Sequence, residues 1–187
     1  MYEDVPAPHP LLLELEQYAQ KEHAAAVERS VGRLLSTLVH AMQANRILDI
    51  GTGFGYATLW MALAQPPLGR IWSFDPNVAR TTIARSYLDR AGGAVHVEIS
   101  NQPALEVLPI FPQHNVDLAF IDAPAPDYGA YLDQCVPLLK RSGLIIFNGV
   151  LARGGLEEFN RRFLEHPELD ATILSIAGGL GIGARIE

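Results

Sequence analysis

The sequence predicts an α/β fold with a seven-stranded, mostly parallel sheet, helices on both faces and extra helices at the N-terminus. Two observations support this prediction. Short apolar runs alternate with helical patterns through most of the chain, which is typical of parallel strands joined by crossover helices. The last two strand-like runs are joined only by Ala-Gly-Gly-Leu at residues 177–180. Because this link is too short for a crossover, one closing strand is expected to run antiparallel to the others.

The elements follow in order after a proline-containing arm at residues 1–10. Apolar residues either recur at helical spacing or form short continuous runs typical of strands, and glycines and prolines mark the ends of several of these segments. We expect helices at 11–26, 27–43, 56–65, 77–93, 104–108, 128–143 and 156–166. We expect strands at 46–50, 70–74, 94–99, 116–121, 144–147, 170–176 and 181–187. Prolines at 66–67 and glycines at 92–93 and 143 mark three of the helix ends.

Composition limits the classes of function. With 187 residues, 49% of them hydrophobic, the chain suits a single domain over residues 1–187. Residues 1–45 are expected to form an N-terminal helical arm, which the family resemblance described below implies to lie over the site. A net charge of −7 argues against nucleic acid as a partner, and paired arginines such as Arg29 and Arg33 are interpreted as solvated helix faces. The sequence has no apolar run of membrane-spanning length, so we expect a cytoplasmic protein. The single cysteine, Cys135, lies in an apolar helical pattern and is expected to be a buried structural thiol.

A glycine-rich loop, Asp49-Ile-Gly-Thr-Gly-Phe-Gly55, follows the first predicted strand. Ligands of open α/β sheets bind at the carboxyl ends of the strands, and glycine lets the backbone approach a ligand closely. The N-terminus of the following helix offers free N–H groups for a phosphate or carboxylate. The loop therefore predicts a small-molecule site at this edge of the sheet.

The order of residues in the loop discriminates between nucleotide ligands. The dinucleotide fingerprint is G-x-G-x-x-G, but here the third glycine comes one position early and Tyr56 takes its place. Asp49 would repel a pyrophosphate but suits an ammonium group, and Asp75, at the end of the second strand, suits ribose hydroxyls. Ribose, ammonium and carboxylate together describe S-adenosylmethionine better than a nicotinamide dinucleotide, which stays as a less favoured alternative.

Five blocks of the sequence resemble the bacterial O-methyltransferases related to catechol and caffeoyl-coenzyme A O-methyltransferases. They are RILDIGTGFGYATLWMA, GRIWSFDPNVARTTIARSYLDRAG, VDLAFIDA, YGAYLDQCVPLLKRSGLIIFNGVL and GGLGIGARI. The resemblance runs in order from about Val27 to Glu187. It implies a class I, Rossmann-like methyltransferase fold that uses S-adenosylmethionine, acts on a hydroxylated small molecule and forms a homodimer.

The resemblance also implies a cofactor site. The loop would hold the methionine end, Asp75 the ribose, residues 101–104 the adenine wall, and Asp122 a place near the sulfonium. Pro103 stands where the family often has an acid or amide. The cofactor-binding residues implied by position are Asp49, Gly51, Thr52, Gly53, Gly55, Tyr56, Asp75, Pro76, Gln102, Ala104 and Asp122.

The family's catalytic metal site is expected to be incomplete. Family members hold a divalent cation with two aspartates and an asparagine. The first aspartate matches Asp122, but the later Asp-Asn pair falls on Asn148 and Gly149, and the family lysine falls on Ala125. One carboxylate and one amide should hold Mg²⁺ or Ca²⁺ poorly. We therefore expect methyl transfer with little or no help from a metal bound by Asp122 and Asn148.

Without the metal, another group must assist the acceptor. Asp122 and His23 are the two candidate catalytic residues. His23 could act as a general base, although a surface histidine is the simpler interpretation. Tyr128 and Tyr131 are either acceptor-pocket or core aromatics, and Asp127 either approaches the site or caps a helix. A second hypothesis is a non-catalytic protein that binds S-adenosylmethionine or a nucleoside, or serves as an oligomer partner.

Overall fold

The computed structural model describes residues 9–23, 27–92, 96–112, 114–152 and 154–187. Within these ranges the chain forms seven α-helices and seven β-strands. Two compact units hold them: one comprises the described residues of Met1–Asn45 with Thr52–Asn101, and the other those of Arg46–Gly51 with Gln102–Glu187. Each unit is described separately below. None of the helices in the described ranges has the length and apolar character that a bilayer crossing needs.

The strands run in the order β3-β2-β1-β4-β5-β7-β6. The β1–β4, β2–β3 and β4–β5 pairs are parallel, whereas β7 is antiparallel to both of its neighbours, β5 and β6. β7 is therefore the reversed strand, which confirms the predicted seven-stranded, mostly parallel sheet. The order reverses between β1 and β4, so the topological switch point lies between these two strands.

The first unit contains four helices and two strands. Its elements are α1 Pro10–Lys21, α2 Arg29–Met42, α3 Tyr56–Ala62, β2 Arg70–Phe74, α4 Val78–Ala91 and β3 Val97–Ser100. α3 contacts α1, α2 and α4, and it also contacts β2. Close packing of α2 on α3 depends on Gly32, where any added Cβ would collide with the indole of Trp60.

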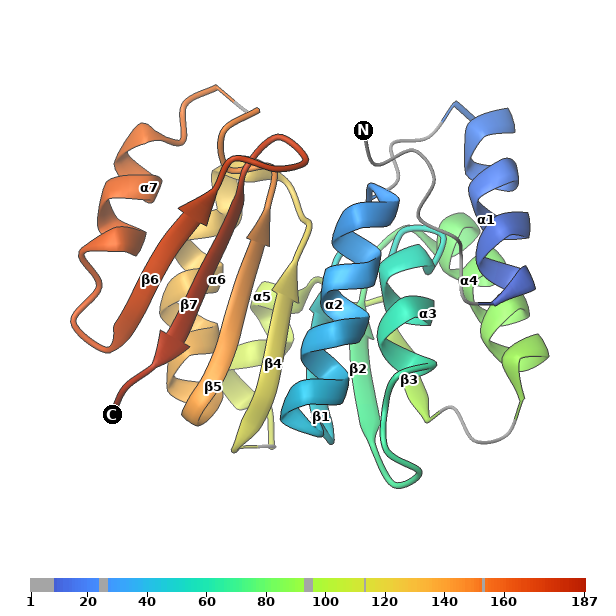
Figure 1. Ribbon diagram of the computed structural model, residues 1–187, viewed down its shortest axis with the longest axis horizontal. Coiled ribbons are helices and arrows are strands. Elements are labelled where there is room, and N and C mark those ends of the chain that lie inside the picture. The colour runs from blue at the N-terminus through green and yellow to red at the C-terminus, as the bar shows by residue number, and fades with distance from the viewer. Residues whose placement is uncertain (1–8, 24–26, 93–95, 113, 153) are drawn as a thin grey trace. The chain divides into compact units, whose positions relative to one another are not determined.

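The second unit contains five strands and three α-helices (Figure 1). Its strands are β1 Arg46–Ile50, β4 Val116–Ile121, β5 Leu139–Asn148, β6 Leu169–Leu174 and β7 Leu180–Arg185. Its helices are α5 Ala104–Val107, α6 Tyr128–Cys135 and α7 Glu157–Leu164, with 3-10 turns at Leu108–Ile110, Ala125–Asp127 and Val136–Leu138. α6 packs on β4 and β5, and α7 packs on β6 and β7.

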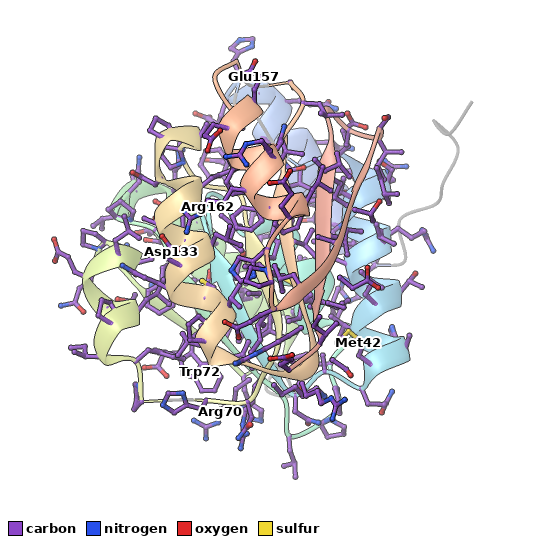
Figure 2. All side chains as sticks on the ribbon, turned by 90° about the vertical axis from the view of Figure 1, so that its left-hand side faces the viewer. Met42, Arg70, Trp72, Asp133, Glu157 and Arg162 are labelled. Carbon is purple, nitrogen blue, oxygen red and sulfur yellow. The ribbon has the colours of Figure 1, made fainter. Side chains whose placement is uncertain are left out.

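An aromatic cluster joins α6, α7 and β5. The ring centroid of Phe147 lies 5.2 Å from that of Tyr128, 4.8 Å from Phe159 and 5.5 Å from Phe163. On the outer side of the same two helices, Asp133 of α6 forms an ion pair with Arg162 of α7, and Figure 2 shows both side chains. Since aromatic pairs add to the free energy of burial, this cluster fixes the end of β5.

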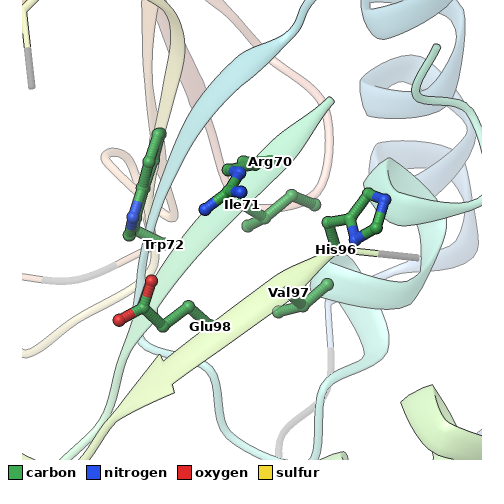
Figure 3. Close-up of a pocket in the computed structure, with 6 residues that line it drawn as sticks. All are labelled: Arg70, Ile71, Trp72, His96, Val97 and Glu98. Carbon is green, nitrogen blue, oxygen red and sulfur yellow. The ribbon is translucent and has the colours of Figure 1, made fainter. Parts of the chain in front are cut away.

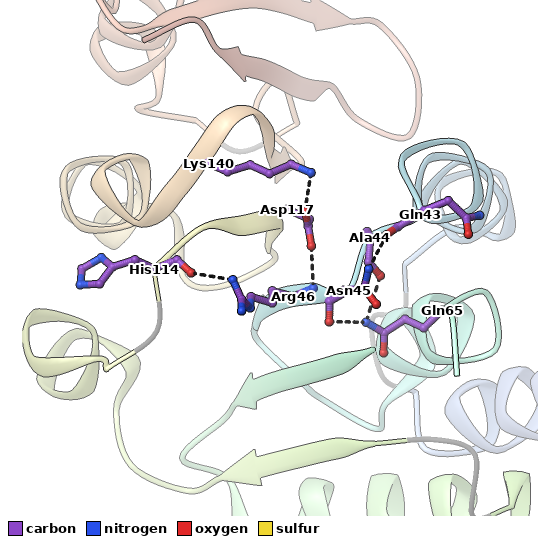
Figure 4. Close-up of polar contacts among 8 residues, drawn as sticks. All are labelled: Gln43, Ala44, Asn45, Arg46, Gln65, His114, Asp117 and Lys140. Atoms are coloured by element: carbon purple, nitrogen blue, oxygen red, sulfur yellow. Dashed lines mark hydrogen bonds and ion pairs between the residues drawn. The ribbon is translucent and has the colours of Figure 1, made fainter. Parts of the chain in front are cut away.

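Polar contacts fix the amino ends of strands in both units (Figure 4). In the second unit, Asp117 accepts a hydrogen bond of 2.7 Å from the backbone N–H of Arg46 and lies 2.5 Å from the ammonium of Lys140. In the first unit, the amide of Gln65 donates to the carbonyl oxygens of Ala44 and Asn45 and to that of Arg70, the first residue of β2. These contacts lie at the end of the strands opposite to the glycine loop.

Most of the predicted elements are confirmed, although several ends differ by a few residues and one boundary is wrong by eight. The helix predicted at 128–143 ends at Cys135, and after a 3-10 turn β5 already begins at Leu139. The pairing of β4 with β5 shifts register between Val116 and Leu118, and Ser142 has a φ of 62°. Because β5 starts irregularly, its first residues do not show the apolar pattern expected of a strand. Residues 24–26 and 94–95, which close one predicted helix and open one predicted strand, lie outside the described residues.

Candidate functional site

The carboxyl end of β1 meets the carboxyl end of β4 at the switch point. Asp49 is fully buried in β1, where it pairs in register with Phe120. One residue after the strand, Gly51 has a φ of 100°, and a Cβ there would overlap the backbone oxygen of Asp122. The backbone N–H of Asp122 donates to Ile50 over 2.8 Å. Only glycine fits at position 51, because both the backbone conformation and the space demand it.

The rest of the glycine loop belongs to the first unit and makes a tight turn into α3. The N–H of Gly55 donates to the carbonyl of Thr52 over 2.8 Å, and Gly53 and Gly55 both have positive φ. The hydroxyl of Thr52 lies 2.5 Å from that of Ser73 on β2, and both side chains are buried. The loop therefore turns sharply, as glycine allows, and a hydroxyl pair that the sequence did not indicate anchors it to β2.

Asp75 follows β2 and has both carboxylate oxygens oriented by backbone donors. Gly53 donates its N–H to Oδ2 and Asn77 donates to Oδ1, each over 2.8 Å. The residue is 8% exposed. Since a carboxylate offers about four acceptor positions, each oxygen keeps capacity for one further donor. This arrangement suits a ligand with two adjacent hydroxyl groups.

Asn101 supports Asp75 from the end of β3. Its amide nitrogen donates to the carbonyl of Asp75 and to the hydroxyl of Thr81, each over 2.8 Å. The sequence placed residues 101–104 on the wall of a ligand site but gave no indication of this supporting contact. The other predicted positions differ in accessibility: Pro76 and Gln102 are exposed, whereas Ala104 is buried and begins α5.

Asp122 and Asn148 end two neighbouring parallel strands. Ile121 pairs in register with Phe147, so the two residues that follow occupy adjacent positions at the same edge of the second unit. Both side chains are partly buried, and no donor among the described residues reaches the Asn148 side-chain oxygen. The structure thus places together the two residues that were predicted as remnants of a metal site.

These residues do not fit a three-ligand cation site. The next position, Gly149, carries no side chain, and its N–H donates to the carbonyl of Gly179 over 2.8 Å. Asp122 and Asn148 offer one anionic and one neutral oxygen, whereas Mg²⁺ needs octahedral coordination and is usually held through carboxylates. No group of three His, Cys, Asp or Glu side chains in the described ranges is arranged to hold a metal ion.

Other polar and aromatic candidates have structural roles. Tyr128 is fully buried and donates its hydroxyl to the carbonyl of Asn148 over 2.5 Å. Tyr131 is also buried, and burial followed by the charge of Asp127 raises its pKa to about 12. The interpretation of both as core aromatics is therefore confirmed. Asp127 occupies the N-cap position of α6, but its side chain makes no capping hydrogen bond, so the alternative of a side-chain cap is not supported.

The predicted base His23 lies just after α1. Its side chain is exposed and its backbone has a φ of 49°, a left-handed conformation. The N–H of His23 donates to the carbonyl of Gln20 over 3.2 Å. This left-handed turn follows directly on the end of α1 at Lys21. A catalytic role for His23 stays a prediction.

A charged cluster that the sequence did not indicate joins α1, α2 and the first residue of α3. Tyr56 donates its hydroxyl to Glu16, and Arg29 donates to both oxygens of that carboxylate, with Nε at 2.9 Å and Nη2 at 2.5 Å. Burial opposes the ionisation of Glu16, but the hydrogen bonds from Arg29 and Tyr56 outweigh it and lower its pKa. Burial, together with the Glu16 carboxylate, raises the pKa of Tyr56. The interpretation of Arg29 as a solvated helix residue was therefore wrong.

Two hollows lie on the first unit. One, of about 350 Å³, adjoins this cluster and is lined by Glu16, Ala19, Gln20, Val27, Glu28, Arg29 and Tyr56. The other, of about 270 Å³, is lined by side chains of β2 and β3 and by His96, which precedes β3 (Figure 3). It includes Arg70 at the amino end of β2, whereas Asp75 follows the opposite end. The second hollow is therefore no part of the glycine-loop site.

Known proteins resemble this chain over most of its length. The sequence matches the O-methyltransferase family over residues 3–186. Catechol O-methyltransferase of Mycobacterium tuberculosis is 37% identical over 168 residues, which cover 83% of this chain and 76% of the relative. Catechol O-methyltransferase of Niastella koreensis is 31% identical over 171 residues, covering 83% and 77%.

Solved structures of O-methyltransferases are also similar to this chain. O-Methyltransferase TomG of Streptomyces achromogenes, in complex with SAM, is 25% identical with a TM-score of 0.88, covering 98% of this chain and 92% of that one. The Bacillus cereus O-methyltransferase in complex with SAH is 25% identical with a TM-score of 0.86, covering 98% and 93%. These similarities confirm the resemblance found in the sequence blocks. The chain therefore belongs to the O-methyltransferase family.

Proposed function

We propose that the protein is an S-adenosylmethionine-dependent O-methyltransferase that methylates a hydroxyl group of a small molecule without a bound divalent cation. The observation that carries the proposal is the pair formed by the glycine loop and Asp75, whose carboxylate is aimed by Gly53 and Asn77. A nucleoside ribose presents the two adjacent hydroxyls that such a carboxylate accepts. The complexes of the related TomG and Bacillus cereus enzymes with SAM and SAH support the same cofactor class.

We assign each predicted cofactor-binding residue to one part of S-adenosylmethionine. Asp75 and Pro76 face the ribose, while Gln102 and Ala104 contact the adenine. Asp49 and the loop residues Gly51, Thr52, Gly53, Gly55 and Tyr56 receive the methionine end, where the buried carboxylate of Asp49 offsets the ammonium group. Asp122 lies near the sulfonium.

Methyl transfer needs a nucleophilic oxygen in line with the carbon–sulfur bond. The acceptor oxygen attacks the methyl carbon, the bond from that carbon to sulfur breaks, and the electron pair stays on sulfur as the neutral thioether of S-adenosylhomocysteine. The hydroxyl proton passes to a base, for which Asp122 is the first candidate and His23 the second. A phenol or catechol suits this scheme, because its hydroxyl ionises more readily than that of an aliphatic alcohol. The catechol O-methyltransferases among the relatives support this acceptor class.

The donor set at Asp122 and Asn148 is the reason for proposing metal-independent transfer. A cation that bound two acceptor oxygens would lower the acceptor pKa, but only one anionic ligand is available to hold it here. Binding and orientation by the protein must therefore supply more of the rate acceleration than in an enzyme whose bound metal activates the acceptor. The predictions of a homodimer and of a cytoplasmic location stay predictions.

A methyl-transfer assay tests the proposed function. The purified chain is incubated with methyl-labelled S-adenosylmethionine and a panel of phenols and catechols, with either EDTA or Mg²⁺. We expect a labelled methyl ether from at least one acceptor, at equal rates under both conditions. Transfer only with Mg²⁺ would contradict the metal-independent mechanism. Cofactor binding with no transfer to any acceptor would support the non-catalytic hypothesis instead.

A further inference from the structure

Helix α1 contacts both residues that flank Gly55 in the glycine loop. The carboxylate of Glu16 accepts the hydroxyl of Tyr56, directly after Gly55. Two residues along the helix, Tyr18 meets the ring of Phe54, directly before Gly55, edge-on with centroids 5.3 Å apart at 88°. Helix α1 therefore contacts the loop at two points, one polar and one apolar.

Glu16 also connects this contact to α2. Its side chain is 17% exposed and that of Arg29 is 31% exposed, so their ion pair is screened less than an ion pair on the surface. Tyr56 is 4% exposed. Removing one partner from a buried, charge-assisted hydrogen bond leaves the other uncompensated, which costs more than the loss of a surface contact. The position of α1 and the position of Tyr56 are thus coupled.

Helix α4 fixes the other side of the loop. A Cβ on Gly55 would lie 2.8 Å from the Cβ of Ala84, so the turn sits directly on α4. The guanidinium carbon of Arg80 lies 6.0 Å from the centroid of Phe54. The loop around Gly55 is thus packed against α4, and α1 adds the contacts to Phe54 and Tyr56.

We propose that Glu16 and Tyr56 are positioning residues for the cofactor: their hydrogen bond holds the glycine loop in its binding conformation and links cofactor binding to the docking of α1. This inference rests on the proposed function, because it assumes that the loop binds the methionine end of S-adenosylmethionine. Neither side chain needs to touch the cofactor. By thermodynamic reciprocity, a ligand that orders the loop must also stabilise the docked position of α1.

The test compares four variants with the wild-type chain: Tyr56→Phe, Glu16→Gln, the double variant, and Glu14→Gln as a matched control. Glu14 lies on the same helix, and its carboxylate lies 2.6 Å from Arg90 of α4 in an exposed ion pair that does not involve the loop. Tyr56→Phe removes one hydroxyl and keeps the ion pair of Glu16 with Arg29, so this variant is expected to fold. Circular dichroism verifies folding before each titration.

Calorimetric titration with S-adenosylhomocysteine gives the first readout. We expect each single loop variant to bind about three- to tenfold more weakly, because a charge-assisted hydrogen bond is lost or weakened. The double variant should lose little more than one single variant, since both changes break the same contact. Glu14→Gln should stay within about twofold of the wild type.

Hydrogen exchange gives the second readout. S-Adenosylhomocysteine should slow the exchange of amides in α1 of the wild type and of Glu14→Gln, but not in Tyr56→Phe. A purely structural role of the hydroxyl would lower the melting temperature of Tyr56→Phe and leave both the affinity and the α1 protection unchanged. That result, with a wild type that binds the ligand, would overturn this inference and leave the proposed function intact. A folded wild type that does not bind S-adenosylhomocysteine would overturn both.

Discussion

The backbone N–H of Gly53 donates a hydrogen bond of 2.8 Å to the side-chain carboxylate of Asp75. This contact joins the middle of the glycine loop to the acid that ends β2, two features that are 22 positions apart. Each orients the other: the N–H of Gly53 aims the carboxylate, and the carboxylate satisfies that N–H within the turn. The loop and the acid therefore form one binding feature.

Substitution of Asp75 by asparagine should damage this feature. The amide keeps one acceptor oxygen, but its NH₂ group must face the N–H of either Gly53 or Asn77. Leaving a buried donor unpaired costs about 1–3 kcal/mol, so we expect affinity for S-adenosylhomocysteine to fall by roughly tenfold or more. The free energy of unfolding should fall by about 1–2 kcal/mol. Calorimetry and urea denaturation measure the two effects, with Asp89→Asn on the exposed side of α4 as control. Equal affinity for both variants would refute the ribose role.

Gly55→Ala should destabilise the protein more than Gly92→Ala. Both positions have positive φ, 86° and 101°, so alanine is strained at either. At Gly55 the new Cβ would also lie 2.8 Å from the Cβ of Ala84, whereas at Gly92 no other described residue comes within 4 Å of it. Strain alone costs about 1–2 kcal/mol, and the collision should add about 1–3 kcal/mol at Gly55. Urea denaturation of the two variants measures the difference, and equal losses would show that α4 yields to the added methyl group.

Restoring the family's metal ligands should create a cation site. The double variant Asn148→Asp with Gly149→Asn supplies the second carboxylate and the asparagine, and Asn tolerates the φ of 76° found at Gly149. We expect Mg²⁺ binding in a calorimetric titration of the double variant, and none in the wild type. Asn148→Asp alone is the control for added charge. Mg²⁺ binding by the wild type would show that Asp122 and Asn148 suffice.

The thiol of Cys135 should be unreactive in the native protein. It is fully buried, and burial raises its pKa to about 12. Because the native pKa is raised, the neutral thiol contributes stability that is present below the unfolded pKa and is lost as pH rises through about 12. At mildly alkaline pH, labelling by a disulfide reagent should require unfolding. Rapid labelling without denaturant would mean that the end of α6 opens locally.

The sequence predicted some elements to the residue and misplaced others for physical reasons. Strands β1, β2 and β4 match the expected ranges because their short apolar runs are bounded by polar residues and glycine. The start of β5 was assigned to a helix because Leu138 and Leu139 continue the apolar spacing of α6. Only the pairing of Val116 with Leu139, a contact distant in sequence, shows that a strand begins there.

In the candidate site, too, some residues were predictable from the local sequence and others were not. The glycines and Asp75 were predictable, because their backbone geometry and position after a strand follow from local sequence. Glu16 and Arg29 were not, since a charged residue on an amphipathic helix usually faces solvent, and the chain position of Glu16 does not reveal that Tyr56 lies opposite. A contact between side chains 40 positions apart depends on how α1 docks, which no local pattern records.

If the cofactor site works without metal, a single titration of the whole chain should show it. The full chain is titrated with S-adenosylmethionine by calorimetry in the presence of EDTA, after circular dichroism has shown that it is folded. We predict single-site binding in the micromolar range that does not change when Mg²⁺ replaces the chelator. Absence of binding by the folded chain, or binding only after Mg²⁺ is added, would contradict this account.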